Sequence, residues 1–215
     1  MPTNEDVVSV PDLRPQHRRV AEATIAVVAQ VTSDDLNRPS TCADWTVGDL
    51  LAHMTVQNHG FAAAAEGRGA DLATWHVGPL GADPVADHTA ATEHVIAAFA
   101  ADGVLERPFV LAELTDQPIP AAQAISFHFV DCVVHGWDVA RSLGLDWALD
   151  DDLLRAALPI AEAVPDGDFR RQPGASFRPR LPSGPGEDPL EEILRLLGRS
   201  PTWPDGCQGG PTASR

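Results

Sequence analysis

The sequence predicts an all-α protein: a four-helix bundle with a long crossover between its second and third helices, followed by a proline- and glycine-rich C-terminal extension. Two observations favour this fold class. Apolar residues recur at the spacing of buried helix faces in four long segments, and no segment of any length alternates apolar with polar residues as a half-buried strand would. Hydrophobic residues also make up 44% of the 215 residues, which is enough for a buried core.

The first two helices are predicted from an apolar stripe and a capping pattern. In residues 12–33, one helix face is marked by the spacing i, i+4, i+7, i+8 and i+11, at Val20, Thr24, Val27, Val28 and Val31. After a loop, the second helix is expected to begin at Thr46, whose hydroxyl can cap it. Asp49 lies three residues later and completes a capping box, and the helix runs to about Gly67.

The next two helices frame the predicted crossover and the most informative segment. Residues 67–83 form the long connection, and an alanine-rich third helix covers about 84–101. A second irregular stretch ends near Pro120. The fourth helix is expected over 121–144, closed by Gly144, because glycine tolerates the left-handed conformation of a helix C-terminus.

The remaining sequence predicts an attachment to the bundle. A short helical segment covers 151–164, and residues 165–188 are rich in proline and glycine without a helical pattern. A final short helix is expected at 189–198. We therefore expect a helical bundle over 1–164 and an irregular extension over 165–215 whose short helix packs on the bundle.

The charge balance and the cysteines limit the classes of partner. Fifteen basic and 31 acidic residues give a net charge of −16, which disfavours binding to nucleic acid or to an anionic membrane surface. We expect no signal peptide, and the sequence has no apolar run long enough to span a bilayer. Its three cysteines lie far apart, without a CxxC motif. We expect a cytoplasmic protein, a monomer or homodimer, that acts on a small molecule.

A polar stripe on the fourth predicted helix indicates where chemistry can occur. Successive side chains turn by about 100° around a helix, so one narrow stripe collects His128, Asp131, His135, Asp138 and Ser142. Almost every other residue of this helix is apolar, which is typical of a buried helix. Because buried imidazoles and carboxylates are costly unless they are paired or metal-bound, the stripe needs a partner.

A divalent metal ion is one such partner. Asp131 and His135 stand one helical turn apart, so a carboxylate oxygen and an imidazole nitrogen can reach a common point. His53, beside the buried stripe of the second helix, is the predicted third ligand, and His59 ranks below it because it lies nearer the far end of that helix. Two histidines and a carboxylate would leave coordination positions open for water or substrate.

Other interpretations of the same residues remain open at this point. Asp131 and His135 can form a purely structural hydrogen-bonded pair, and His128 can be a core residue or a hydrogen-bond donor to a ligand. Asp138 precedes Arg141 by three residues, which predicts a local ion pair. Cys132 is expected to be an inert buried thiol. The histidines without ligand spacing are expected at the surface: His17, His76, His88 and His94.

Three segments, in this order, resemble the DinB-like metal-binding proteins of the actinobacterial mycothiol-dependent maleylpyruvate isomerase group. They read RPSTCADWTVGDLLAHM, DCVVHGWDVARSLG and DPLEEILRLLGRSPTW. The resemblance implies a DinB-like four-helix bundle and a metal held at His53, Asp131 and His135. Two features depart from the group: the fourth-helix carboxylate is usually Glu, and this C-terminal portion is short and irregular rather than a separate α/β domain.

The resemblance also implies a reaction. A divalent ion, expected to be zinc, would activate a low-molecular-weight thiol, mycothiol, for addition to an electrophilic small molecule, as in an isomerase or S-transferase. His128 or Asp138 would shuttle a proton or orient a ligand. The alternatives are a thiol-independent Lewis-acid enzyme (hydrolase, lyase or cyclase), a non-catalytic metal-binding module, and a metal-free bundle with a buried histidine–aspartate network.

Overall fold

A computed structural model describes residues 11–42, 44–172, 175–184 and 188–204. Over these residues the chain is mostly helical, with six α-helices and one two-stranded sheet. The helices are α1 (Arg14–Val28), α2 (Val47–Ala65), α3 (Pro84–Ala100), α4 (Ala121–Leu143), α5 (Asp151–Ala163) and α6 (Pro189–Leu196). None of the helices in the described ranges is both long and apolar enough to cross a membrane.

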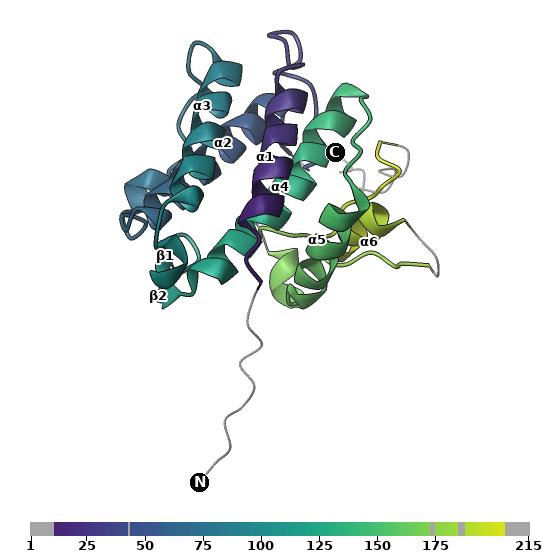
Figure 1. Ribbon diagram of the computed structural model, residues 1–215. Helices are drawn as coiled ribbons and strands as arrows, with labels where there is room; N and C mark the ends of the chain where they lie inside the picture. Colours follow the sequence, from purple (N-terminus) through teal and green to yellow (C-terminus); the bar gives the residue numbers. More distant parts are fainter. Residues whose placement is uncertain (1–10, 43, 173–174, 185–187, 205–215) are drawn as a thin grey trace.

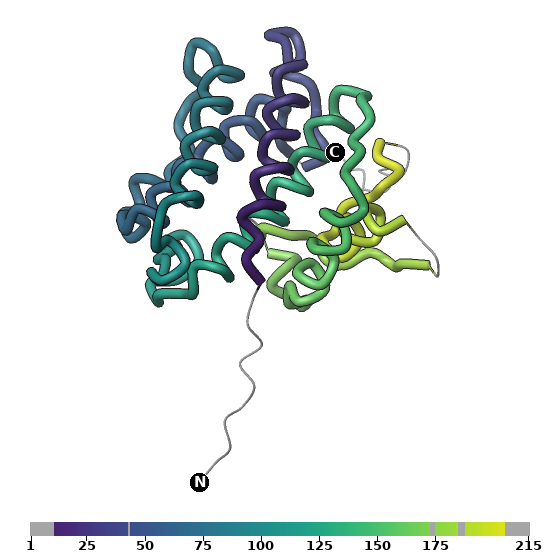
Figure 2. Tube along the Cα trace, viewed as in Figure 1, coloured from purple at the N-terminus to yellow at the C-terminus, as the bar shows by residue number. Residues whose placement is uncertain are grey.

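The helix α4 runs through the middle of the molecule. On one side α1 packs along α4, while α2 pairs with α3 and also reaches α4 (Figure 1). On the other side α5 packs against α4 and α6 packs against α5, as the trace in Figure 2 also shows. Because it has neighbours on both sides, α4 is buried over most of its length, as its apolar sequence predicted.

The predicted helix ends are confirmed at the two positions where the sequence carried a specific signal. The side chain of Thr46 accepts a hydrogen bond from the backbone N–H of Asp49, and the Asp49 carboxylate accepts one from the backbone N–H of Thr46. Gly144 ends α4 with φ of 74°, in the left-handed region. By contrast, α1 covers only Arg14–Val28 and is shorter than the predicted segment.

A small antiparallel sheet corrects the expectation that the chain has no strands. Strand β1 (Phe109–Leu111) pairs with β2 (Thr115–Ile119) in the stretch predicted to be irregular. In β1 only the first and last of three residues are fully buried, and β2 is mostly exposed. Three residues are too few for an alternating pattern to stand out, so sequence periodicity missed this hairpin.

Arg170 organises the proline- and glycine-rich extension. It lies in a short 3₁₀ helix, Asp168–Arg171, inside the segment predicted to have no helical pattern. Its guanidinium is only 1% exposed and donates to the backbone carbonyls of Pro165, Arg178 and Leu196. Because backbone carbonyls buried without partners are costly, one arginine satisfies several irregular segments at once.

The close contact between Trp75 and Gly60 of α2 allows the packing of this helix to be tested. A Cβ added at Gly60 would lie 2.3 Å from Cε3 of Trp75, whose ring is 7% exposed and therefore has little room to move. We expect Gly60→Ala to lower the free energy of unfolding by about 1–3 kcal/mol through overpacking. This loss outweighs the gain of about 1 kcal/mol in helix propensity.

The matched control is Gly78→Ala, because a Cβ at Gly78 meets no atom within 4 Å. Chemical denaturation of both variants measures the difference. The control should stay within about 0.5 kcal/mol of the native chain. Equal stability of the two variants would show that Trp75 does not pack against Gly60 as described.

Candidate metal centre

The structure brings together the three side chains predicted as metal ligands. His53 comes from α2, and Asp131 and His135 come from α4; one donor atom of each lies within 4.8 Å of the others. Nε2 of His135 is 3.3 Å from Oδ1 of Asp131, and the rings of His53 and His135 are 5.1 Å apart between centroids. The group therefore combines two imidazoles and one carboxylate from two helices.

Local sequence explains how these side chains meet. The four-residue spacing on α4 stacks Asp131 and His135 on one face, because such residues are neighbours on a helix surface. The Thr46 cap fixes where α2 begins, and His53 follows two turns later. The ring of Trp45 lies 5.0 Å from the ring of His53, so the indole packs against the imidazole.

Asp138 fixes the orientation of the His135 ring through a hydrogen bond at Nδ1. Nδ1 of His135 is 2.9 Å from Oδ2 of Asp138, a carboxylate with no exposed side-chain surface. A hydrogen bond at Nδ1 fixes the ring orientation and leaves Nε2 to face Asp131. This arrangement, a carboxylate behind a histidine whose other nitrogen faces a ligand group, is common at metal sites.

The predicted ion pair between Asp138 and Arg141 is wrong. Arg199, from the C-terminal segment, places Nη2 3.0 Å from Oδ2 of Asp138, and Thr41 donates its hydroxyl to the same carboxylate. Arg141 instead donates to the backbone carbonyl of Trp203. Asp138 faces the interior and its partners lie 61 and 97 residues away in sequence, so spacing along α4 could not reveal them.

Burial and charge give the three groups different protonation preferences. Burial disfavours the charged form of His135, but the carboxylates of Asp131 and Asp138 outweigh burial and raise its pKa well above the ordinary value. Burial likewise disfavours the Asp131 carboxylate, but His135 outweighs it and lowers the pKa of Asp131. Burial, and then the neighbouring His135, lower the pKa of His53 to about 4. His53 is therefore neutral near neutral pH, whereas the two carboxylates favour the charged form of His135.

Solvent reaches one side of the group, and a narrow cavity lies on the other. The side chain of Asp131 is 26% exposed and His53 is half-buried, so the outer side is accessible. The inner cavity has a volume of about 10 Å³, which is the scale of a single water molecule. Its lining comes from α1, α2, α3 and α4: Thr24, Met54, Asn58, His88, His128, Asp131, Cys132 and His135.

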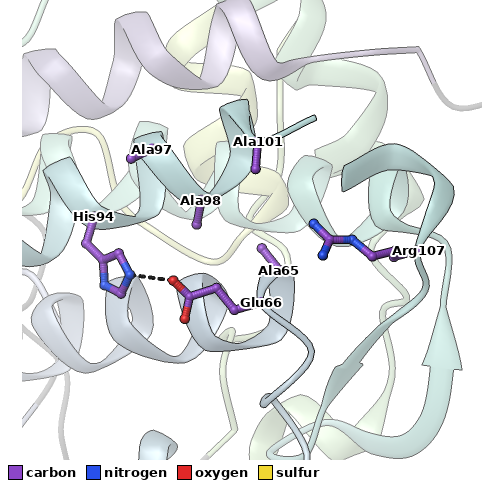
Figure 3. A pocket seen from close by; sticks show the side chains of 7 residues that line it. All are labelled: Ala65, Glu66, His94, Ala97, Ala98, Ala101 and Arg107. Carbon is purple, nitrogen blue, oxygen red and sulfur yellow. Dashed lines mark hydrogen bonds and ion pairs between the residues drawn. The ribbon is translucent and has the colours of Figure 1, made fainter. Parts of the chain in front are cut away.

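A wider pocket lies elsewhere and shares no residue with the candidate centre. It is an open hollow of about 460 Å³ between the ends of α2 and α3, mostly lined by alanines (Figure 3). His94 and Glu66 form an ion pair at its edge, with 2.7 Å between Nε2 and Oε1. The residues that line this pocket do not form a group of converging ligand atoms. A metal site is therefore better supported between α2 and α4.

The prediction that His17 and His88 lie at the surface is wrong. His17 is 1% exposed and His88 has no exposed surface, whereas His76 and His94 are exposed as predicted. The helical spacing of both residues indicates that they are buried. His17 precedes the buried Val20 by three residues, and His88 precedes the buried Thr92 by four, so each continues the buried face of its helix.

His128 lies next to the candidate centre rather than among its three ligands. Nδ1 of His128 is 2.7 Å from Nε2 of His17, and the ring lines the same inner cavity as Asp131 and His135. Burial lowers the pKa of His128 to about 4. The ring is therefore neutral near neutral pH.

Three residues around Asp138 were not predicted from the sequence: Thr41, Cys42 and Arg199. Cys42, in the loop before α2, donates its thiol to Asp138 across 3.5 Å, and Arg199 supplies the cation that faces the same carboxylate. All three lie within the segments quoted for the family resemblance, but none has a spacing that marks it as part of a site.

Comparisons with known proteins agree with this architecture. Uncharacterized proteins from two strains of Mycobacterium tuberculosis are each 29% identical over 189 residues, which covers 86% of this chain and 96% of theirs. No solved structure matches the chain. The family model of the mycothiol maleylpyruvate isomerase N-terminal domain matches residues 17–140, more than half of the chain and all three residues of the candidate centre. The chain therefore belongs to the mycothiol maleylpyruvate isomerase N-terminal domain family.

Proposed function

We propose that this chain is a divalent-metal-dependent enzyme that activates a low-molecular-weight thiol, mycothiol, for addition to an electrophilic small molecule, as an isomerase or S-transferase. His53, Asp131 and His135 would hold the ion. The observation that carries the proposal is the convergence of these three donors within 4.8 Å, from two helices of a domain whose family is mycothiol-related. Helices α1–α4 would form the DinB-like bundle with the crossover between α2 and α3, within a domain over 1–164, and 165–215 would be its extension.

The donor set fits zinc. Bonds of about 2.0–2.1 Å around a tetrahedral zinc ion place neighbouring nitrogen and oxygen donors roughly 3.3–3.4 Å apart. The 3.3 Å between His135 Nε2 and Asp131 Oδ1 matches that separation. Three protein ligands, rather than four, are typical of catalytic zinc sites, which keep a position for water or substrate.

The proposed roles of the residues follow from their contacts. A bound divalent ion would stabilise a thiol sulfur as thiolate near neutral pH. Asp138 contacts His135 and would act as a positioning residue, since its hydrogen bond fixes the imidazole. His128 lines the narrow inner cavity and contacts His17, so it would pack beside the centre rather than meet a substrate on the outer side.

A second candidate, a non-catalytic metal-binding module, is favoured by one observation. The inner cavity beside Asp131 and His135 has room for about one water molecule, not for a substrate. The exposed part of Asp131 favours the enzyme, because a substrate can approach from the outer side without entering that cavity. Binding of a thiol to the metal-loaded protein separates the two candidates.

Removal of one ligand tests the metal centre. We expect His135→Ala to lower the zinc bound per chain by one equivalent, because it deletes a ligand nitrogen and leaves Asp131 without its partner. Zinc content after dialysis, measured by inductively coupled plasma mass spectrometry, gives the result. His59→Ala is the matched control, since His59 is exposed on the same helix as His53. Equal zinc content in the two variants would contradict the assignment.

The raised pKa of His135 predicts proton release when zinc binds. Asp131 and Asp138 raise the pKa of His135 and so favour its charged form, which must lose a proton to become a ligand. His53, whose pKa is about 4, contributes no proton near neutral pH. Zinc titration calorimetry of the native chain in buffers of different ionisation enthalpy should therefore show release of about one proton for the ion bound at this centre, and this release should disappear as the pH rises through the pKa of His135. A proton release that does not change with pH would show that His135 is not both charged and a ligand.

Thiol binding tests the proposed activity itself. Mycothiol should bind the zinc-loaded native chain and release a proton, because a coordinated sulfur is held as thiolate. S-methylated mycothiol is the control, as it cannot form that thiolate, and zinc-treated His135→Ala should bind neither compound. Calorimetry measures all four combinations. If mycothiol binds no better than its S-methyl derivative, the thiol reaction is wrong and the non-catalytic candidate is favoured.

A further inference from the structure

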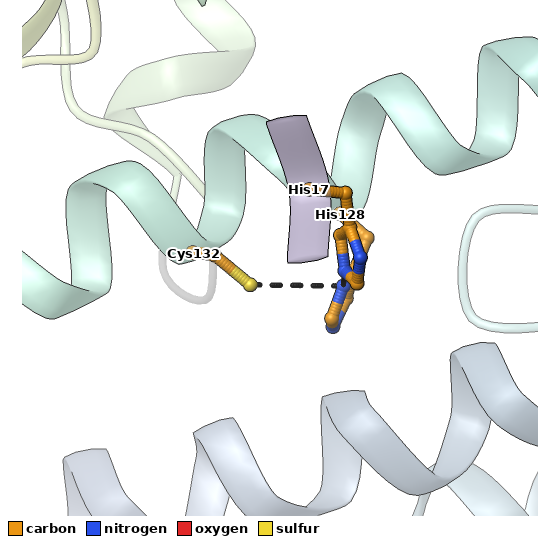
Figure 4. Close-up of side chains that lie close together, drawn as sticks. All are labelled: His17, His128 and Cys132. Carbon is orange, nitrogen blue, oxygen red and sulfur yellow. Dashed lines mark hydrogen bonds between the residues drawn. The ribbon is translucent and has the colours of Figure 1, made fainter. Parts of the chain in front are cut away.

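A second group of possible metal ligands lies deeper in the protein. His17 of α1 and His128 and Cys132 of α4 place one donor atom each within 4.8 Å of one another. Figure 4 shows the two imidazoles side by side, with the Cys132 sulfur directed toward them. Nε2 of His17 is 2.7 Å from Nδ1 of His128, which in turn is 3.7 Å from Sγ of Cys132. All three side chains are at most 7% exposed.

An unsatisfied histidine faces the same cavity. His88 of α3 has no exposed surface, and neither Nδ1 nor Nε2 of its ring has a hydrogen-bond partner. A neutral imidazole carries one donor and one acceptor, and leaving such buried groups unpaired costs about 1–3 kcal/mol each. His88 lines the cavity together with His128 and Cys132. Unpaired buried polar groups in a native protein call for an explanation such as a bound ion.

We propose that His17, His128 and Cys132, with His88, bind a second metal ion of the zinc class, one that accepts thiolate and imidazole ligands. The His88 ring lies outside the group within 4.8 Å and would have to turn toward the ion. Three imidazoles and one thiolate would then make a closed, four-ligand set, which is typical of structural zinc sites. Such an ion would join α1, α3 and α4. Its ligands are all different from His53, Asp131 and His135, so this site does not depend on the proposed function.

The distances within the cluster are close to those of a zinc site. Around a tetrahedral zinc ion, two nitrogens lie roughly 3.3 Å apart and a nitrogen and a sulfur roughly 3.6 Å apart. The separation of His128 Nδ1 and Cys132 Sγ, 3.7 Å, matches. The two imidazole nitrogens are 2.7 Å apart and would have to separate by roughly 0.6 Å, replacing their mutual hydrogen bond by bonds to the ion.

The chemistry of the ligands also separates this site from the first. A thiolate is a softer ligand than a carboxylate and favours zinc or copper(I) over magnesium or calcium. The first centre offers only nitrogen and oxygen donors. A spectroscopic signal from a metal–sulfur bond can therefore be assigned to the second site.

The experiment uses cobalt(II) as a probe of sulfur ligation. In a Cys42→Ser/Cys207→Ser variant, Cys132 is the single cysteine of the chain. After removal of bound metal, cobalt(II) should produce a near-ultraviolet thiolate-to-cobalt charge-transfer band, which should saturate at one equivalent once His135→Ala has removed the first centre. Adding His135→Ala should leave this band in place, because that change removes only the first centre. Absence of the band from the single-cysteine variant, with its circular dichroism unchanged, would overturn the second site.

Two further variants exclude loss of folding as the explanation. Cys132→Ser should abolish the band, and His88→Gln should weaken cobalt binding at least tenfold, with the helical circular dichroism of both retained. His94→Gln, an exposed histidine of the same helix as His88, is the matched control and should bind cobalt as tightly as its parent. A band that survives Cys132→Ser would contradict the assignment, as would equal affinity in the two histidine variants.

Discussion

The buried carboxylate of Asp138 is the constraint on which the rest of the site depends. It has no exposed surface, and a charge in that position is tolerated only when its partners compensate the lost hydration. Arg199 from the C-terminal segment, Thr41 from the loop before α2 and His135 from its own helix provide that compensation. Three separate parts of the chain must therefore fold together before His135 is held in place.

This dependence gives the C-terminal extension a role in the candidate centre. Arg170 binds the carbonyls that shape the extension, and the extension carries Arg199 to Asp138. Arg199 is only 10% exposed, so its contact is part of the core rather than a loose surface ion pair. The irregular residues after α5 thus stabilise the orientation of a histidine on α4, although they supply none of the three proposed ligands.

The sequence predicted what local spacing encodes and missed what depends on distant contacts. The four-residue spacing of Asp131 and His135, the Thr46 cap and the Gly144 helix end are local, and each was predicted. Arg199 could not be placed, because helical periodicity says nothing about contacts between segments 61 residues apart. His17 and His88 are a different case: their helical spacing indicates burial, whereas the prediction of exposure rests only on the absence of a ligand pattern. The β1–β2 hairpin is too short to carry an alternating pattern.

The central claim is that one ion is held by His53 and His135 nitrogens and an Asp131 oxygen. Zinc K-edge X-ray absorption on a Cys42→Ser/Cys132→Ser/Cys207→Ser variant loaded with one equivalent of zinc measures this most directly, because no cysteine sulfur remains. The account predicts a low-coordinate shell of nitrogen and oxygen at about 2.0–2.1 Å, with the outer-shell scattering of two imidazoles. A six-oxygen shell without imidazole scattering, or a failure of this variant to retain zinc, would contradict it.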